Sequence, residues 1–367
     1  GWFLVCINYL LVCISCWVFY RILHEKLNQP EEQTLRWILT CMVWALLFYW
    51  AQEENLTWGF QSQFFLAQLL PLCGFFFLHQ SHNSVKHGTR YFAGATICGV
   101  LAIGSMANGV LALPLMVSLA LFLRMKWHRI LLLLLLSAAC VSAFFYNYTS
   151  TGGTSLKQIW LEAPFVRYFF IYIGGIFYHM TGKTSPMVAL IAGVFLLLAA
   201  LYHATVTILS IGKKPTSLNL ALLTFLVYFG GTALATTIGR SINGISYAVE
   251  SRYQTPGVMA WSVILILFSA SLMRVFNKTP LRVWPPLLLL MLAFLPLQIT
   301  ANHSKNETLF QRKVAALALE LGIKDDNKMR SVYPDERIYS AAKVAIERDL
   351  SFFNDPLIRN TKALLGQ

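Results

Sequence analysis

Long apolar runs and short polar links alternate along the chain, and this alternation predicts its architecture. The apolar runs recur about every 20 to 30 residues, and most approach the roughly 20 residues that an α-helix needs to cross a bilayer. The chain lacks the roughly ten-residue segments of alternating hydrophobicity that are typical of a transmembrane β-barrel. We therefore predict an all-α polytopic membrane protein with about ten transmembrane helices. The predicted helices cover residues 1–20, 37–52, 63–79, 91–123 as two shorter helices, 130–147, 186–208, 219–238, 257–273 and 284–299.

The distribution of charge supports this class and adds an orientation. Only 12% of the residues are charged and 57% are hydrophobic, which is too apolar for a soluble domain of 367 residues. Residues 1–300 contain 18 Lys and Arg, and 13 of these lie in one alternating set of links: 21–36, 79–90, 124–129, 212–217 and 274–282. Basic residues favour the cytoplasmic side of a membrane, so we predict that these links are cytoplasmic. The segments predicted on the outer face are then 53–62, 149–165, 239–256 and the C-terminal tail.

Two segments depart from a simple alternation of spans. The apolar run at 166–181 is one too many for strict alternation, and we expect an interfacial or re-entrant helix that does not cross. After residue 299 the chain becomes polar and holds nine of its 16 acidic residues, with amphipathic patterns at 311–321 and 338–350. This predicts a multi-span transmembrane domain over 1–299 and a small, soluble, α-helical extracytoplasmic tail over 300–367.

The composition also argues against several kinds of site. The net charge of +13 belongs almost wholly to the membrane part and follows the cytoplasmic bias, so we predict no nucleic-acid partner. All seven Cys lie in apolar runs, where they are typical of small buried residues and not of disulfides. His79, His82 and His87 lie in a predicted cytoplasmic link without Cys or carboxylate, which indicates a solvent-exposed loop and not a metal site.

The link at 53–62 begins with two adjacent carboxylates. Glu53 and Glu54 lie at the end of a predicted span, and neighbouring residues on a helix point about 100° apart, so one can face a cavity while the other faces water. A carboxylate at the bilayer boundary is a candidate general base for a hydroxyl group. The alternative is simple solvation at the interface, with Asn55 or Thr57 capping the next helix.

Amide and aromatic side chains suited to a sugar follow the two carboxylates. Asn55, Trp58, Gln61 and Gln63 lie within one short stretch. Aromatic faces stack on the apolar faces of sugar rings, and side-chain amides bind hydroxyl groups. Asn108 interrupts the predicted helix pair within 91–123 and is a further candidate for the same cavity, with a plain Asn-Gly turn as the alternative.

Two other outer links contribute cations. Arg240, Arg252 and Tyr253 lie in one link, and Arg is suited to bidentate phosphate binding. The alternative is an ion pair with Glu250 that only shapes the link. Lys157 lies in a Gly-containing stretch that we interpret as a lid or acceptor-side loop, because it does not have the spacing of a phosphate-binding P-loop.

Several short motifs, in order along nearly the whole chain, resemble bacterial membrane glycosyltransferases of the GT-C type. These motifs are residues 54–64, Ser105-Met106-Ala107-Asn108-Gly109 followed by Pro114, Ser251-Arg252-Tyr253 followed by Thr255-Pro256, and Val332-Tyr333-Pro334-Asp335. The resemblance implies a GT-C fold and a polyprenyl-phosphate-linked sugar as donor. The sugar would pass to a glycan, lipid or protein acceptor at the outer face of the bacterial inner (cytoplasmic) membrane.

The resemblance also implies roles for particular residues. Arg252 and Tyr253, and less closely Arg240, match residues at the lipid phosphate. The catalytic acid of the family, usually Asp, lies in a first outer loop before the span that matches residues 1–20. This sequence starts after that point, so we expect either that an N-terminal span and loop are missing from it or that Glu54 or Glu53 takes the role. Members of the family differ in their use of a divalent metal, and no other cofactor is expected.

Other functions fit parts of the same pattern. A lipid-linked oligosaccharide polymerase or ligase would also need outer Arg residues and a base, but its donor would be an assembled glycan on pyrophosphate. A lipid or glycan transporter would place charges at the bilayer midplane, whereas the charges here lie at span ends on one side. An assembly subunit without a site is a further alternative. The one-sided charges favour the transferase.

Overall fold

The computed structural model describes residues 2–146, 163–182, 185–210, 217–278, 280–329, 337–348, 350 and 353. These residues are predominantly helical and contain no β-strand. The helices coincide with the apolar runs of the sequence, so the predicted class of helical membrane protein is confirmed.

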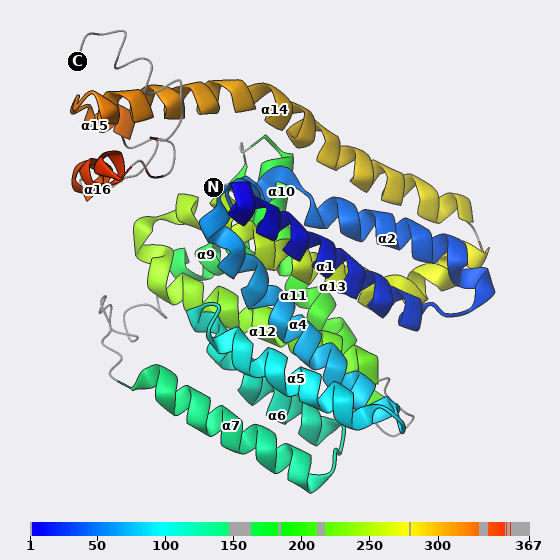
Figure 1. The fold of residues 1–367 in the computed structure, drawn as a ribbon. Coiled ribbons are helices and arrows are strands. Elements are labelled where there is room, and N and C mark those ends of the chain that lie inside the picture. Colours follow the sequence, from blue (N-terminus) through cyan, green and yellow to red (C-terminus); the bar gives the residue numbers. More distant parts are fainter. Residues whose placement is uncertain are drawn as a thin grey trace. The chain divides into compact units, whose positions relative to one another are not determined.

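Short helical turns join some of the long helices, as between α2 and α4 and between α5 and α6 (Figure 1). In chain order the helices are α1 (Trp2–Lys26), α2 (Gln33–Leu47), α3 (Glu53–Thr57), α4 (Ser62–Asn83), α5 (Gly88–Ile103), α6 (Ala112–Phe122), α7 (Trp127–Phe145), α9 (Ala163–Ile173), α10 (Gly175–Met180), α11 (Pro186–Leu209), α12 (Ser217–Arg240), α13 (Gln254–Lys278), α14 (Pro280–Glu320), α15 (Asp326–Met329) and α16 (Arg337–Glu347). Single 3₁₀ turns occupy Pro30–Glu32, Trp50–Gln52, Gly59–Gln61, Ala107–Leu111, Ser241–Asn243, Ile245–Val249 and Ser251–Tyr253.

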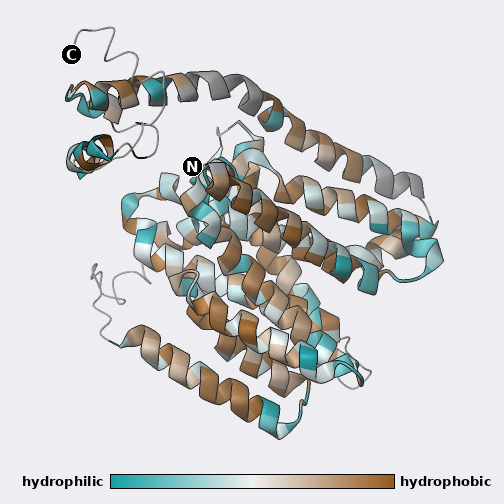
Figure 2. Cartoon of the chain, viewed as in Figure 1, coloured by the Kyte–Doolittle hydropathy of each residue, from teal (hydrophilic) through white to brown (hydrophobic). Residues whose placement is uncertain are grey.

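Seven helical stretches of the described residues are long and apolar enough to cross a membrane. They are Phe3–Lys26, Pro30–Thr57, Gly59–Asn83, Trp127–Phe145, Pro186–Leu209, Ser217–Asn243 and Ser251–Lys278. The other three predicted spans correspond to shorter apolar helices, Gly88–Ile103, Ala107–Phe122 and Leu287–Ile299. Hydrophobic residues run along the sides of the helices, and hydrophilic residues gather near their ends (Figure 2). This distribution is the one a multi-span membrane protein requires.

The links predicted to be cytoplasmic meet at one end of the helices. Arg129 Nη1 donates a hydrogen bond to Ser81 Oγ (2.9 Å), and His79 contacts both Glu25 and Ser217. These contacts bring together the C-terminal ends of α1 and α4 and the N-terminal ends of α7 and α12. We call this the basic end, because it carries the Lys- and Arg-rich links.

Two of the links predicted on the outer face, 53–62 and 239–256, meet at the opposite end. Asn55 in α3 donates to the carbonyl of Arg252, and His179 Nε2 in α10 lies 2.9 Å from the carbonyl oxygen of Val249. We call this the cavity end. The 22 residues of α4 separate the two ends by about 33 Å at a rise of 1.5 Å per residue. The described links that the charge pattern separates therefore lie at opposite ends of the helices of the unit Trp2–Leu297.

The apolar run at 166–181, predicted as one helix, is divided into α9 and α10 at Gly174. A Cβ atom on Gly174 would lie 1.9 Å from the carbonyl oxygen of Ala189, and one on Gly193 would lie 2.0 Å from that of Phe170. The backbones of α9 and α11 therefore touch, as small residues allow between membrane helices. The sequence pattern showed the apolar run but not the close approach that divides it.

The described chain forms two compact units, Trp2–Leu297 and the residues from Gln298 onward. In the second unit, buried apolar side chains of α14, α15 and α16 form a small cluster that includes Ala315, Leu319, Met329 and Ala342. The sequence predicted a span at 284–299 and a separate helix at 311–321. Instead α14 runs without a break through both, because no Gly or Pro follows residue 296 within it.

The contact between α9 and α11 predicts that adding one methyl group at Gly193 destabilises the protein. Gly193→Ala should lower the free energy of unfolding by about 1–3 kcal/mol, because the Phe170 carbonyl is backbone and cannot rotate away. Gly230→Ala is the matched control, since a Cβ atom at Gly230 in α12 would meet nothing within 4 Å. The measurement is thermal unfolding of the purified protein in detergent. Equal melting temperatures for both variants would contradict the close contact.

Candidate functional site

A cavity of about 460 Å³ opens at the cavity end of the bundle. Its walls come from the turn before α4 and the first turns of α4, the turn before α6, α9, the last turns of α12 and the start of α13. The lining residues are Trp58, Phe60, Gln61, Gln63, Phe64, Gln68, Met106, Ala107, Asn108, Tyr172, Thr232, Ala235, Thr236, Gly239, Arg240, Arg252, Tyr253 and Pro256. Seven side chains that the sequence singled out thus share one cavity: Trp58, Gln61, Gln63, Asn108, Arg240, Arg252 and Tyr253.

The cavity has a rim and a floor that can be located along α12. Arg240 is the last residue of α12, and Thr232 lies eight residues earlier, about 12 Å deeper at helical rise. Asn108 Nδ2 donates a hydrogen bond to Thr232 Oγ1 (3.1 Å), which places Asn108 at the deeper level. Gln68 is also deep, because Tyr228, one turn below Thr232, donates to the carbonyl of the adjacent Ala67 (2.6 Å). We therefore distinguish a floor (Gln68, Asn108, Thr232) from a rim (Arg240, Arg252, Trp58).

Aromatic rings occupy the wall between rim and floor. The ring of Tyr253 lies 6.3 Å from that of Phe64 and 6.0 Å from that of Tyr172, centroid to centroid. Burial raises the pKa of the Tyr172 phenol, although a hydrogen bond with Thr236 partly opposes the shift, so this phenol is neutral at physiological pH. The wall therefore offers apolar ring faces and a neutral hydroxyl group.

Arg252 lies at the rim between the cavity and a carboxylate. Its Nη2 forms an ion pair with Glu250, and its guanidinium carbon lies 5.3 Å from the centroid of the Tyr253 ring. Glu54 is close enough to act electrostatically on the same guanidinium. The ion pair considered as the alternative from the sequence is thus present. It does not remove Arg252 from the site, since Arg252 also lines the cavity and its Nε is buried without a hydrogen-bond partner in the described structure.

Three predicted site residues, Glu53, Glu54 and Asn55, do not line this cavity. Glu53 and Glu54 begin α3, next to the rim, and both are partly exposed. Asn55 is fully buried and turned toward α13. Lys157 lies outside the described residues.

The side chain of Asn55 joins two distant segments of the chain. Its Nδ2 donates to the carbonyl oxygen of Arg252 (2.8 Å) and to Thr255 Oγ1 (2.7 Å). Thr255 in turn donates to Gln52 Oε1 (2.7 Å), and Asn8 of α1 donates to the carbonyl oxygen of Asn55 (2.8 Å). With its amide nitrogen used in this way, Asn55 positions the rim and does not face a ligand.

The lining residues that the sequence analysis missed include the polar residues Gln68, Tyr172 and Thr232. Gln68 carried a usable signal, because it is an amide within the apolar part of a span and is only 1% exposed. Polar side chains inside membrane helices are costly to bury and often mark functional sites. Tyr172 and Thr232 had no such signal, since both residue types are ordinary in membrane helices.

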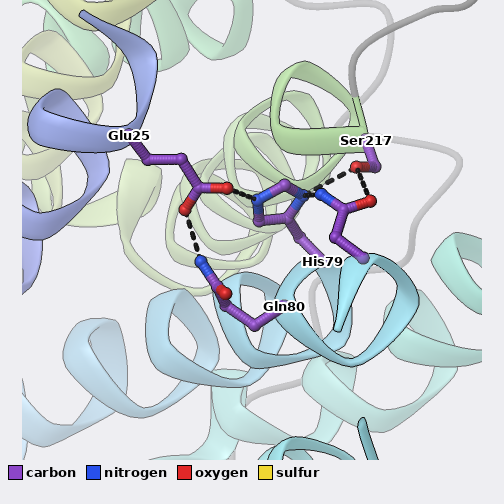
Figure 3. A network of polar contacts seen from close by, with 5 residues as sticks. Glu25, His79, Gln80 and Ser217 are labelled. Atoms are coloured by element: carbon purple, nitrogen blue, oxygen red, sulfur yellow. Dashed lines mark hydrogen bonds and ion pairs between the residues drawn. The ribbon is translucent and has the colours of Figure 1, made fainter. Parts of the chain in front are cut away.

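A second polar cluster lies at the basic end (Figure 3); its His79 follows the cavity-floor residue Gln68 by 11 residues on α4, about 17 Å at helical rise. His79 Nε2 lies 2.6 Å from Glu25 Oε1, and His79 Nδ1 lies 2.7 Å from Ser217 Oγ. Gln80 donates to the other oxygen of Glu25, and Asn83 accepts from Ser217 (3.3 Å). The cluster therefore links α1, α4 and α12. The prediction of a solvent-exposed loop was wrong for His79, which lies in α4 and is 2% exposed. His82 is exposed as predicted but also lies in α4, and the prediction is confirmed for His87, an exposed turn residue.

The described residues contain no group of three or more His, Cys, Asp or Glu side chains that could hold a metal ion. The divalent metal associated with some GT-C transferases therefore finds no ligand set in this part of the chain. The site has instead the parts for binding a phosphate, through guanidinium groups, and a hydroxyl-bearing group, through amides.

The role of Asn55 predicts a loss of stability when its amide is removed. Asn55→Ala should lower the free energy of unfolding by about 1–3 kcal/mol, because buried polar groups of Arg252 and Thr255 lose a partner. Asn243→Ala is the control, because Asn243 is an exposed Asn at the same end. Thermal unfolding in detergent compares the two variants. A melting temperature of Asn55→Ala equal to that of the wild type would contradict the role.

Comparison of the chain with protein-family models, with curated proteins and with solved structures found no match. The interpretation of the site therefore depends on its own geometry and chemistry.

Proposed function

We propose that this protein is a membrane glycosyltransferase. It moves a sugar from a polyprenyl-phosphate donor to a glycan, lipid or protein acceptor at the outer face of the bacterial inner membrane. The observation that carries this proposal is the cavity, which combines two guanidinium groups at its rim with amides at its floor and lies at one end of an apolar helical bundle. A ligand with an anionic group, a polar head and a long apolar tail fits all three features.

The phosphate of the donor lies at the rim in this proposal. Arg252 and Arg240 supply the positive charge, and guanidinium groups bind phosphate oxygens with paired hydrogen bonds. Trp58 and Phe60, also on the rim side, are 47% and 67% exposed. Large exposed aromatic side chains at a membrane boundary suit contact with an isoprenoid chain that leaves the cavity toward lipid.

The reaction requires a base for the hydroxyl group of the acceptor. That oxygen attacks the anomeric carbon of the donor, its proton passes to a carboxylate, and the bond from the anomeric carbon to the phosphate oxygen breaks. The polyprenyl phosphate leaves with the bonding electron pair, and Arg252 stabilises its charge. We assign the base to Glu54, with Glu53 as the second candidate, because Glu54 lies near Arg252 at the rim, where an acceptor would arrive.

The membrane arrangement is part of the proposal. We propose that the seven long spans and the three shorter apolar helices all cross, and that α9 and α10 together lie at the outer interface without crossing. The contact of α10 with Val249 and that of Gly174 with Ala189, near the start of α11, support this placement, because both contacts are at the cavity end. The basic end then faces the cytoplasm, and the residues after 299 lie outside.

The role of Arg252 is tested by its removal. Arg252→Ala should abolish binding of farnesyl phosphate, a short-chain donor analogue, because the phosphate loses its main charged partner. Arg274→Ala is the matched control, an exposed Arg near the far end of α13, the helix that follows Arg252. Stabilisation by farnesyl phosphate is measured as the shift in melting temperature in detergent, and sugar transfer is measured in proteoliposomes. Sugar transfer retained by Arg252→Ala would contradict the proposed role of Arg252 in phosphate binding. Transport of the intact donor across the membrane without sugar transfer would contradict the proposal that the protein is an enzyme.

The role of Glu54 is tested separately. Glu54→Gln should reduce the rate of sugar transfer by roughly 10²–10⁴-fold, the usual contribution of a general base, while leaving farnesyl phosphate binding unchanged. Glu53→Gln should stay within a few-fold of the wild type. If Glu250→Gln lost sugar transfer while Glu54→Gln stayed active, the result would identify Glu250 as the general base and contradict the assignment to Glu54.

A further inference from the structure

Two links at the basic end carry positive charge that no acidic residue of their own region balances. Lys86 and Arg90 lie between the end of α4 and the first turn of α5, and Arg124 and Lys126 lie between α6 and α7. All four residues are exposed, and their side chains form no salt bridge with a described residue. Residues 55–161 contain no Asp or Glu. The charge therefore remains available to an anion from outside the protein.

The side chain of Arg129 holds these two links side by side. Its Nη1 donates to Ser81 Oγ in the last turns of α4 (2.9 Å), and its Nη2 lies 3.5 Å from Thr89 Oγ1 at the start of α5. Its guanidinium carbon lies 5.2 Å from the centroid of the Phe92 ring. The first turn of α7 is therefore attached to both α4 and α5. The exposed cations of the two links thus belong to one surface, which we call the cationic surface (Lys86, Arg90, Arg124 and Lys126).

Arg124 belongs to the cationic surface in spite of an unfavourable backbone conformation. Its φ is 50°, a positive value that no other described residue except Gly shows. The N–H of Arg124 donates to the carbonyl of Leu121 (2.9 Å), and the N–H of Met125 donates to that of Ala120 (3.0 Å). These two bonds form a Schellman motif, which usually has Gly at the position of Arg124, because a side chain is strained there. An exposed guanidinium group at a position suited to glycine indicates a role outside the packing of the fold.

Apolar side chains beside the cations indicate which kind of anion binds. Trp127 directly follows Lys126 and is 68% exposed, and Phe122, two residues before Arg124, is 62% exposed. From Trp127 onward, α7 is the least buried of the seven long spans. A soluble anion has no group to place against these apolar side chains. A phospholipid can pair its phosphate with the cations and lay its acyl chains along α7.

We infer that the cationic surface binds the head group of an anionic phospholipid, with the acyl chains against α7. Exposed Lys and Arg side chains attract the phosphate of such a lipid. A zwitterionic lipid gains less, because its own cationic group already balances its phosphate. The inference does not depend on the proposed function, since no residue of the cationic surface lines the cavity.

The experiment measures the melting temperature of the purified, delipidated protein in detergent after addition of phosphatidylglycerol, or of phosphatidylcholine with the same acyl chains. Phosphatidylglycerol should raise the melting temperature by at least about 3 °C more than phosphatidylcholine does, because it binds the folded protein more tightly. High salt should reduce this difference. The triple variant Lys86→Gln, Arg90→Gln and Lys126→Gln should lose most of the difference.

Two further variants separate lipid binding from effects on the fold. Arg124→Gly should melt no lower than the wild type in phosphatidylcholine, because glycine relieves the backbone strain, and yet it should gain less from phosphatidylglycerol. Arg21→Gln is the matched control and should keep the full difference. It removes an exposed cation at the same end, from the link 21–36, in which three acidic residues balance three Lys and Arg.

Equal stabilisation of the wild type by the two lipids would overturn the inference, and so would a difference that survives in both the triple variant and Arg124→Gly. An equal loss in Arg21→Gln would also overturn it, because the effect would then follow net charge and not the cationic surface. Stabilisation by glycerol 3-phosphate equal to that by phosphatidylglycerol would show that the surface binds a soluble phosphate and not a lipid.

Discussion

The cavity end depends on the buried amide of Asn55. The Asn55 side chain connects α3 with the start of α13, about 200 residues later. The side chain of Asn8 in α1 binds the backbone carbonyl of Asn55. At membrane depth the polar backbone of such turns has little water to bind, so internal partners are needed. Because Asn55 binds the carbonyl of Arg252 itself, it fixes the backbone from which the guanidinium group extends to Glu250 and the Tyr253 ring. The rim would not have a defined shape without it.

The cluster around His79 has the corresponding effect at the basic end. It fixes α4 and α12 to α1 through Glu25 and Ser217, and these two helices also supply most of the cavity floor. The same two helices are also joined beside the cavity floor, where Tyr228 of α12 donates to the carbonyl oxygen of Ala67 in α4. A cavity between helices held in this way keeps its dimensions, which favours discrimination between ligands of similar size.

The sequence predicted the fold well where one physical signal dominates. The length and spacing of apolar runs located the membrane helices, and the basic links correctly grouped the residues that meet at each end. Candidate residues were found where side-chain chemistry was unusual for its surroundings, as at Arg252 and Trp58. Asn55 was assigned to a ligand because its type suits sugars, and only the three-dimensional contacts show that its amide is used internally. Gln68 was passed over because it lies inside a run judged by its average hydrophobicity. The break at Gly174 depends on a neighbour that sequence spacing does not reveal.

In the ion pair at the rim, the Glu250 carboxylate balances the positive charge of Arg252. With its charge already matched, Arg252 attracts passing inorganic anions weakly, and any ligand that takes the guanidinium has to exchange with a carboxylate held only two residues away in the chain. Small anions gain little from that exchange, whereas an amphiphilic anion adds the burial of its polar head and its contact with the aromatic wall. The Glu250 carboxylate thus competes with any anionic ligand for Arg252. A ligand binds only if its contacts with the whole cavity outweigh the loss of this ion pair, and negative charge alone is not enough.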